Sequence, residues 1–304
     1  YVGTTFSGGT NGAYRALAKA DVLLVVGATL DYRTGFARPP AVAESARIVR
    51  VDVDPGELSK PVEPDIGIVA DARSALTQML AQAEAHTWPH EGWLAEVRGM
   101  RARLLNRWKP RGRREGLPLT SLQLCRELGS FLDEDVTFLV DGGNIGRWAN
   151  LLLWDRHPGH WVTCGASGVI GWGLAGAVAA KMARPDHPVL LLSGDGSAGF
   201  TLAEIETAIR FQTPYVAVVA HDGAWGIEAD SRAPDRRAGT VLGEIRFDKV
   251  AQALGGEGVY IESVDELAPA IRRGLKADTV TFIHVPTELG GVGYIERQYA
   301  ATGA

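Results

Sequence analysis

Two short acidic segments of the chain combine residue types that could do chemistry. Gly194-Asp195-Gly196 ends one apolar run, and His221-Asp222 follows a second apolar run, Tyr215 to Ala220. An amphipathic stretch, 202–211, lies between them, so the order is strand, glycine turn, helix, strand, polar pair. Because parallel strands of an α/β sheet end at the same edge, where ligands bind, this order predicts that the two acidic side chains lie close together.

The chemistry predicted for this edge is that of a magnesium ion beside a phosphate. Magnesium prefers oxygen ligands and is commonly held by one or two carboxylates together with substrate phosphates. Asp195 and Asp222 would supply the carboxylates, and the backbone carbonyl of Ala224 could supply a third oxygen. A Gly-Asp-Gly taken alone is more often only a tight turn, but the strand–helix–strand frame and the second acidic turn favour the ligand site.

The residues around Asp195 suit the close approach of a phosphate. Gly194 and Gly196 allow a backbone conformation that most residues avoid, and they leave room for a ligand. Ser197 can cap the helix that follows, and a helix N-terminus favours a phosphate nearby.

Residues 1–85 are predicted to form part of a parallel α/β domain. Strands are expected at 21–27, 47–54 and 66–70, and helices at 11–20 and 72–84. Three strands are few for an open doubly wound sheet, so we expect this Rossmann-like domain to be incomplete.

Residues 86–118 are predicted to be a linker between two domains. The segment holds three prolines and a basic run from Arg98 to Arg114. A nucleic-acid or membrane patch is one interpretation of that run. A solvated helix and linker is favoured, because the rest of the chain is acidic.

Residues 119–304 are predicted to form a second parallel α/β domain. Its expected strands are 136–141, 188–193, 215–220, 258–261 and 279–285, and its expected helices are 121–132, the second half of 165–180, 202–211, 248–254 and 264–277. The predicted fold class is therefore α/β, with two parallel-sheet α/β domains of which the first is incomplete.

Composition narrows the class of protein. The 304 residues are 46% hydrophobic and 22% charged, as in soluble globular proteins. A net charge of −5 argues against a general nucleic-acid binder. Only Cys125 and Cys164 occur, which argues against a disulfide framework or a zinc site and makes a reducing cytoplasm the expected location. No apolar stretch reaches the roughly 18–20 residues that span a bilayer, so no membrane association is expected.

The two acidic segments and their surroundings resemble a known cofactor motif. Residues 194–200 and 221–228 are similar to the motif of thiamine-diphosphate enzymes, in which Gly-Asp-Gly is followed after about two dozen residues by Asn-Asn. By pattern, the acetolactate synthase and 2-oxo acid decarboxylase group is the most similar. Residues 20–28 and 51–55 resemble the central domain of these enzymes, and 119–286 resemble their diphosphate-binding domain.

The resemblance implies roles for individual residues. Asp195, Asp222 and the carbonyl of Ala224 would bind Mg²⁺, with Gly194, Gly196 and Ser197 beside the cofactor's diphosphate. Two further candidates lie on the segment before the glycine- and alanine-rich helix: the carbonyl of Gly168 would face the aminopyrimidine group, and Ile170 would bend the cofactor. Trp225 would lie beside the cofactor, and Glu228 falls where some relatives carry a catalytic glutamate. Asn144, with Gly142 and Gly143, would lie on a loop near the active site.

Several of these residues have a plainer interpretation. Ile170 taken alone is more often a core residue, and Glu228 could be a surface carboxylate. Trp225 could pack under its loop rather than touch the substrate. Cys164 could line the cavity or be a small buried filler.

Two departures from the family pattern affect what can be inferred. His221-Asp222 replaces Asn-Asn, so the ligand position keeps its oxygen but gains a negative charge. His221 is either a local structural substitution or a titratable, catalytic group near the site. In addition, cofactor activation in the family needs a glutamate from a pyrimidine-binding domain that precedes the central domain. Because the chain starts at Tyr1 inside a seemingly incomplete domain, we expect a fragment of a longer enzyme or the diphosphate-binding subunit of a split one, inactive alone.

The function expected from the resemblance is that of a thiamine-diphosphate- and Mg²⁺-dependent lyase or transferase. It would cleave or join carbon–carbon bonds next to a carbonyl, with a 2-oxo acid as donor. A homodimer or homotetramer is implied, since the family shares its site between subunits, and FAD or ADP in the central domain stays open. The alternative is a non-catalytic relative that binds the cofactor. A nicotinamide dehydrogenase is disfavoured, because G-x-G-x-x-G is missing after both Val26 and Ser193.

Overall fold

The computed structural model describes residues 2–5, 12–108, 116–132, 135–153 and 160–290. The chain divides into two compact units, Tyr1–Arg107 and Trp108–Ala304. Each is built on its own parallel sheet, which confirms the predicted fold class of two parallel-sheet α/β domains. In the described residues, no helix combines the length and the apolar character needed to cross a bilayer.

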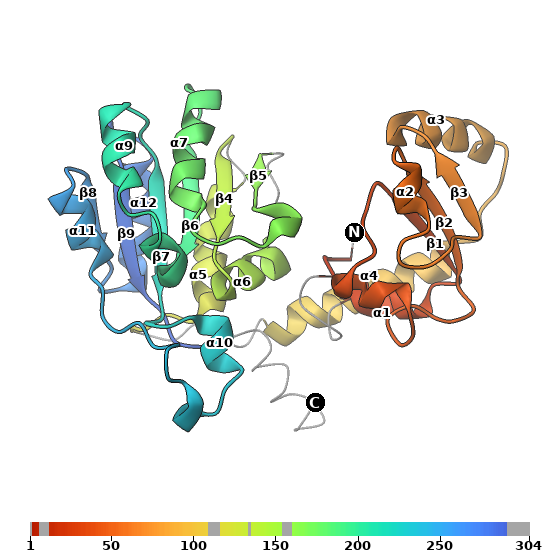
Figure 1. The fold of residues 1–304 in the computed structure, drawn as a ribbon, viewed down its shortest axis with the longest axis horizontal. Coiled ribbons are helices and arrows are strands. Elements are labelled where there is room, and N and C mark those ends of the chain that lie inside the picture. Colours follow the sequence, from red (N-terminus) through yellow and green to blue (C-terminus); the bar gives the residue numbers. More distant parts are fainter. Residues whose placement is uncertain (1, 6–11, 109–115, 133–134, 154–159, 291–304) are drawn as a thin grey trace. The chain divides into compact units, whose positions relative to one another are not determined.

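The first unit is a three-stranded parallel sheet in the order β1-β2-β3, which are Val22–Val26, Arg47–Asp52 and Ile66–Val69 (Figure 1). Its small core contains Val25, Leu30 and Ile48. The helices of the unit are α1 (Gly12–Lys19), α2 (Pro55–Leu58), α3 (Ala72–Ala83) and α4 (Glu91–Trp108), and η1 (Tyr32–Ala37) is a 3₁₀ segment. Helix α4 lies within 86–118, the segment expected to be a linker.

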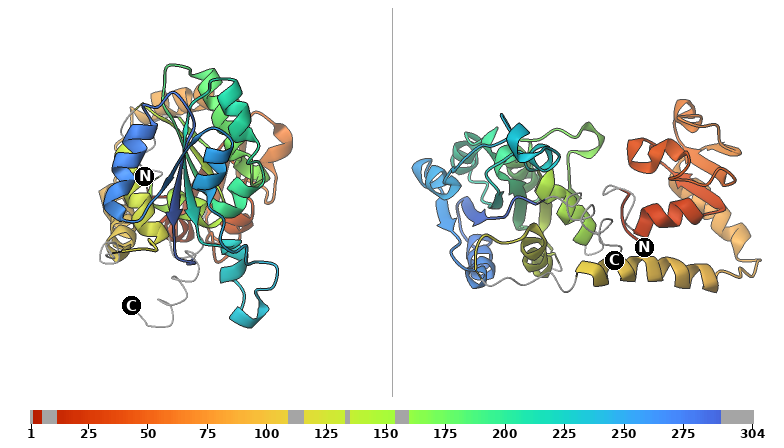
Figure 2. Two further views of the ribbon diagram at one scale, coloured as in Figure 1. Left: turned by 90° about the vertical axis from the view of Figure 1, so that its left-hand side faces the viewer. Right: turned by 90° about the horizontal axis from the view of Figure 1, so that it is seen from below.

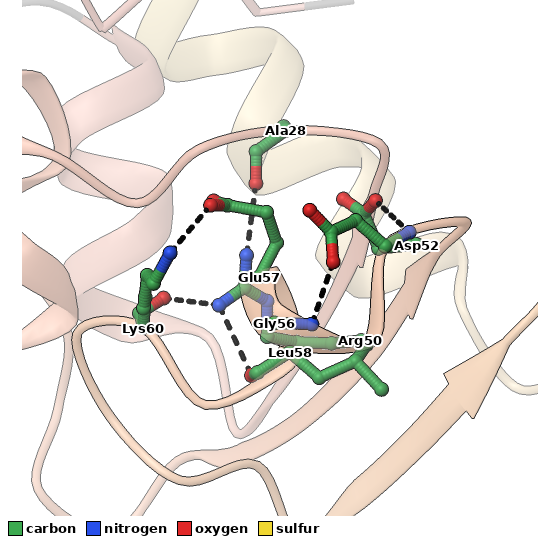
Figure 3. A network of polar contacts seen from close by, with 8 residues as sticks. Ala28, Arg50, Asp52, Gly56, Glu57, Leu58 and Lys60 are labelled. Carbon is green, nitrogen blue, oxygen red and sulfur yellow. Dashed lines mark hydrogen bonds and ion pairs between the residues drawn. The ribbon is translucent and has the colours of Figure 1, made fainter.

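A buried arginine on the central strand ties together the carboxyl end of this sheet. Arg50 is 1% exposed. Its guanidinium donates to the carbonyls of Ala28 (3.2 Å), Leu58 (3.1 Å) and Lys60 (Figure 3). One side chain thus links the segment after β1 to helix α2 and the residues that follow it.

The second unit is a six-stranded parallel sheet in the order β5-β4-β6-β7-β9-β8. In chain order these strands are β4 (Thr137–Asp141), β5 (Trp161–Val162), β6 (Val189–Gly194), β7 (Val216–His221), β8 (Glu257–Tyr260) and β9 (Thr281–Pro286). Leu190, Val218 and Phe282 on the central strands are fully buried. Strands covered on both faces have continuous apolar sequences, and for this reason the runs before Asp195 and Asp222 were recognisable as strands.

Helices cover both faces of the second sheet. Helices α5 (Ser121–Leu128), α6 (Asn144–Leu152) and α12 (Val264–Gly274) lie on one face, and α7 (Gly173–Ala183), α9 (Glu204–Arg210) and α11 (Phe247–Ala253) lie on the other (Figures 1 and 2). Two short helices, α8 (Asp195–Gly199) and α10 (Gly226–Asp230), begin just beyond the carboxyl ends of β6 and β7. The acidic segments therefore lie where adjacent parallel strands end, the edge at which ligands bind in such folds.

Candidate functional site

The structure brings Asp195 and Asp222 together at the carboxyl edge of the second sheet. Strands β6 and β7 pair so that Gly194 lies beside Ala220. The backbone N–H of Gly223 donates to Oδ2 of Asp195 at 2.8 Å, and the N–H of Gly196 donates to Oδ1 at 2.7 Å. Asp195 is only 4% exposed, so these bonds hold its carboxylate inside the turn that follows β7.

Asp222 is held by two hydrogen bonds, one from its own turn and one from Asn144, which follows strand β4. Its Oδ1 accepts the N–H of Ala224 at 3.1 Å, and its Oδ2 accepts Nδ2 of Asn144 at 3.2 Å. Asn144 is the first residue of α6, and its Oδ1 is buried with no hydrogen-bond partner among the described residues. The residues after β4, β6 and β7 thus converge on one cluster, which leaves an oxygen of Asn144 still to be satisfied.

The electrostatics of this cluster suit a divalent cation. Burial raises the pKa of Asp195 from 3.8 to about 6. Burial, and then the negative charge of Asp195, raise the pKa of Asp222 to about 6 as well. A cation between the two carboxylates would stabilise their charged forms and so lower both pKa values, because its positive charge offsets the cost of burying two negative charges. The two carboxylates therefore suit a cation such as Mg²⁺, and the role of the Ala224 carbonyl as a third ligand stays a prediction.

The protein side chains offer only part of a coordination sphere. Across the described residues, no group of three or more His, Cys, Asp or Glu side chains is arranged to hold a metal. Two carboxylates and a backbone carbonyl would leave positions for phosphate oxygens and water, as is usual for magnesium bound with a phosphorylated ligand.

Trp225 packs directly on the Gly194-Asp195-Gly196 turn. A Cβ atom on Gly196 would lie 2.7 Å from the Trp225 ring, and this ring lies 5.6 Å from that of Phe200. Glycine at position 196 is therefore required by the packing of the indole. Ser197 is buried within α8.

The loop before α7 carries the other two expected cofactor contacts. Gly168 adopts a left-handed conformation with φ of 64° and is exposed, whereas Ile170 is half-buried. Cys164, which precedes the 3₁₀ turn η5 (Gly165–Ser167), is partly buried. The loop is tied to Asp141, the last residue of β4, through the backbone N–H groups of Gly171 and Gly173.

Glu228 lies on the surface of α10. Its side chain is 59% exposed and pairs with Arg232 one helical turn later, at 3.5 Å. Its neighbour Ile227 points the other way, because a Cβ on Gly143 would lie 2.5 Å from the Ile227 side chain. Glu228 is thus open to solvent, as is Gly168.

His221 lies beneath the cluster rather than in solvent. It is 6% exposed, its Nε2 accepts a long hydrogen bond from the N–H of Ile245 (3.4 Å), and the same atom is 3.9 Å from Oδ2 of Asp195. Its ring lies 4.7 Å from that of His284, which in turn stacks on Tyr260 at 5.0 Å. A column of three aromatic rings, of which the two histidines are buried and Tyr260 is half-buried, therefore supports the end of β7.

Burial of the His284 side chain predicts that the free energy of unfolding decreases in acid. It is fully buried, neither ring nitrogen has a hydrogen-bond partner in the part of the chain that the structure describes, and burial is the main cause that lowers its pKa from 6.5 to about 4. The unfolded chain therefore binds the extra proton between pH 6.5 and pH 4, and stability is lost as the pH falls through that window. His284→Phe should reduce the stability difference between pH 7 and pH 5 by about 2 kcal/mol.

Urea unfolding at pH 7 and pH 5 measures this effect. The titratable and charged groups that face the ring are His221, Asp248, Arg246 and Tyr260, and comparison with the unaltered protein isolates the change made at position 284. His86→Phe, at an exposed histidine of the first unit, is the control and should leave the difference unchanged. An equal pH dependence in His284→Phe and in the unaltered protein would contradict the assignment.

Two residues of the site were not identified as ligand-site residues from the sequence. In the sequence, Asp141 marks only the end of a predicted strand, although an acidic residue directly before Gly142-Gly143 repeats the pattern of an acidic group at a strand end. Asn144 was placed on a loop near the active site, but its contact with Asp222 depends on α6, which the sequence analysis did not anticipate.

Comparison with known families agrees with this geometry. Residues 1–79 match the central domain of thiamine pyrophosphate enzymes, and residues 141–285 match the C-terminal TPP-binding domain of the same enzymes. The second match begins at Asp141 and contains both acidic segments.

Individual relatives extend over nearly all of the chain. Acetolactate synthase large subunit IlvG of Mycobacterium tuberculosis is 31% identical over 297 residues, covering 94% of this chain and 52% of that protein. Sulfoacetaldehyde acetyltransferase of Castellaniella defragrans is 29% identical, covering 93% of this chain and 52% of that protein. The chain thus spans about half the length of the curated relatives it matches.

A solved structure shows the same fold. The thiamine diphosphate-dependent 4-hydroxybenzoylformate decarboxylase of Rhodococcus jostii RHA1 aligns with a TM-score of 0.69 at 24% identity, over 91% of this chain and 50% of that one. The matched domains, the relatives and the fold confirm the resemblance of the two acidic segments, and the chain belongs to the thiamine pyrophosphate enzyme family.

Proposed function

We propose that this chain binds thiamine diphosphate with Mg²⁺ as part of an acetolactate synthase-like enzyme that acts on a 2-oxo acid. The observation that carries the proposal is the hydrogen bond from Gly223 to Asp195, which joins the ends of β6 and β7. It brings Asp195 and Asp222 into one cluster. The pKa values of both carboxyl groups are raised there, and a bound cation would lower them toward their ordinary range.

Each end of the cofactor would meet a different part of the second unit. Asp195, Asp222 and the carbonyl of Ala224 would hold the cation, which in turn would hold the diphosphate beside Gly194, Gly196 and Ser197. Trp225 would close the turn over α8. Gly168 and Ile170, on the loop before α7, would contact the aminopyrimidine end.

When bound, thiamine diphosphate supplies the nucleophile and electron sink for breaking or forming a carbon–carbon bond next to a carbonyl. The chain's own contribution would be to orient the cofactor, exclude water and hold protons. Glu228 and His221 are the candidate acid–base groups. Glu228 is exposed and could approach a substrate, whereas buried His221 would act by supporting Asp195.

The substrate class and the assembly are part of the proposal. The relatives include an acetolactate synthase, a pyruvate oxidase and 2-hydroxyacyl-CoA lyases, whose names imply carbonyl substrates or products. Since the chain spans about half of such relatives, a complete site would also require a pyrimidine-binding domain, either in the same protein or in a separate chain. A cytoplasmic homodimer or homotetramer is the proposed setting, with a flavin or adenine nucleotide in the first unit as an open option.

A second candidate is a relative that binds the cofactor without catalysis. Two observations favour it: Asn-Asn is replaced by His221-Asp222, and the carboxylate of Glu228 pairs with Arg232 on the surface. Such a protein would keep the cation and diphosphate contacts while lacking an acid–base group in position.

Titration calorimetry of the protein that carries this chain, in its native assembly, tests the proposal. Thiamine diphosphate should bind with Mg²⁺ and much more weakly with a chelator present. Carbon dioxide release from pyruvate and from aromatic 2-oxo acids then separates the two candidates. Absence of Mg²⁺-dependent binding would contradict both, and binding without turnover of any 2-oxo acid would favour the non-catalytic relative.

A further inference from the structure

Asp141 is a buried carboxylate at which three parts of the second unit meet. It is 2% exposed and ends β4. Its Oδ2 accepts the N–H of Gly173 at 2.8 Å and that of Gly171 at 3.1 Å. Burial raises the pKa of this carboxylate, and the hydroxyl of Ser197, in the turn after β6, also acts on it and lowers that pKa. One side chain therefore contacts both the loop before α7 and the segment that carries Asp195.

A second tether joins the same loop to the same segment. The hydroxyl of Thr201 donates to the carbonyl of Gly171 at 2.8 Å. Gly171 has a φ of 83°, and a Cβ atom there would lie 2.5 Å from Phe200. A Cβ atom on Gly173 would lie 2.7 Å from that of Asp141. Loop and turn are packed so closely that neither can move without the other.

The donors around Asp141 suit a carboxylate and no other side chain of its size. Two backbone N–H groups and one hydroxyl converge on two oxygens, which together offer about four acceptor positions. Asparagine would direct an NH₂ group toward donors and leave at least one of them unpaired. Because these donors occupy its oxygens, Asp141 stabilises the fold of the site rather than binding the cation.

We propose that Asp141 is a positioning residue that sets the distance between the two halves of the cofactor site: the loop with Gly168 and Ile170, and the turn with Asp195. This inference rests on the proposed function, since it assigns the loop to the aminopyrimidine end and the turn to the diphosphate end. A ligand that bridges both halves depends on their spacing, whereas a ligand that occupies only the turn does not.

The prediction compares two ligands on one variant. In Asp141→Asn, affinity for thiamine diphosphate with Mg²⁺ should fall about 10- to 100-fold, the loss typical of disturbed supporting contacts. Affinity for inorganic pyrophosphate with Mg²⁺, which fills only the diphosphate end, should change less than about threefold. Both affinities are measured by calorimetry on the protein that carries this chain. A merely structural role would lower the two affinities together.

Asp248→Asn is the matched control. Asp248 is another 2%-exposed aspartate of the same unit, but its carboxylate is bound by Arg246, remote from the loop. It should leave the ratio of the two affinities unchanged. If Asp141→Asn does not fold, Thr201→Val decides the question, because it removes the second tether at nearly constant volume and should change the ratio in the same direction.

The outcomes separate this inference from the proposed function. Failure of the unaltered protein to bind thiamine diphosphate with Mg²⁺ overturns the proposed function and this inference with it. Normal binding to the unaltered protein, with an unchanged ratio in Asp141→Asn or, if that variant does not fold, in Thr201→Val, overturns the inference alone. A selective loss for thiamine diphosphate supports it.

Discussion

Replacing Asp195 by alanine is expected to weaken binding of thiamine diphosphate with Mg²⁺ by at least about 100-fold, which is roughly 3 kcal/mol. The carboxylate is the buried group at the end of β6, and it also accepts the N–H of Gly223 that holds the turn after β7. Its removal would delete a metal ligand and loosen the turn that carries Asp222. Calorimetry with and without Mg²⁺ measures the loss.

Two further variants test whether the loss of cofactor affinity comes from the loss of cation binding. Asp195→Asn keeps the shape and one acceptor oxygen but leaves the N–H of Gly196 or Gly223 unpaired, so it should destabilise the turn less than alanine does while binding Mg²⁺ less tightly. Asp186→Ala changes an exposed aspartate in the segment that leads into β6 and should leave binding unchanged. Unaltered cofactor affinity in Asp195→Ala would remove Asp195 from the site.

The second large effect concerns the stability of the first unit. Arg50→Met should destabilise that unit by about 3 kcal/mol or more, since it strips a charged donor from carbonyls of Ala28, Leu58 and Lys60. Methionine keeps much of the buried volume, so the loss isolates the polar contacts. Hydrogen exchange, resolved by peptide over β1, β2 and β3, is the suitable measurement because it reports the first unit separately.

Arg47→Met is the matched control on the same strand. The Arg47 side chain is 67% exposed and lies 3.9 Å from Asp65, so its loss should cost less than about 1 kcal/mol. Similar exchange rates in Arg50→Met and Arg47→Met would show that the guanidinium of Arg50 does not brace the unit.

The sequence was most informative where burial imposes a simple pattern. Strands β6 and β7 were recognisable because both faces of the second sheet are covered, which demands uninterrupted apolar residues. Once two such strands flank a helix, the carboxyl-edge rule brings Asp195 and Asp222 together without further information. The parallel α/β class of both units followed from the same alternation of apolar strands and helical segments.

Helix α6 was not predicted, because its stability comes from tertiary packing. Helix α6 begins directly after Gly142-Gly143, and its own glycine at position 146 resembles continued turn sequence. It forms because Ile145, Trp148 and Ala149 are buried against the rest of the unit. Without α6, the contact between Asn144 and Asp222 could not be foreseen. Helix α10 is similarly short and follows a glycine-rich turn.

The roles of Asp141 and Arg50 depend on partners that are distant in sequence. Asp141 accepts from Gly171 and Gly173, about 30 residues away, and those donors converge only after the loop folds. Strand β2 carries two arginines, Arg47 and Arg50, and an arginine in a strand normally suggests an exposed position. The burial of Arg50 can be explained only by carbonyls that non-local segments bring to it.

The central claim is that one cation lies between the ends of β6 and β7 and carries the cofactor's diphosphate. Crystals grown with thiamine diphosphate and Mn²⁺ in place of Mg²⁺ test it most directly, through the anomalous signal of the metal. The account predicts a single strong peak bound by Asp195, Asp222 and the carbonyl of Ala224, in contact with the diphosphate. A peak elsewhere, or a diphosphate held away from Asp195, would contradict it.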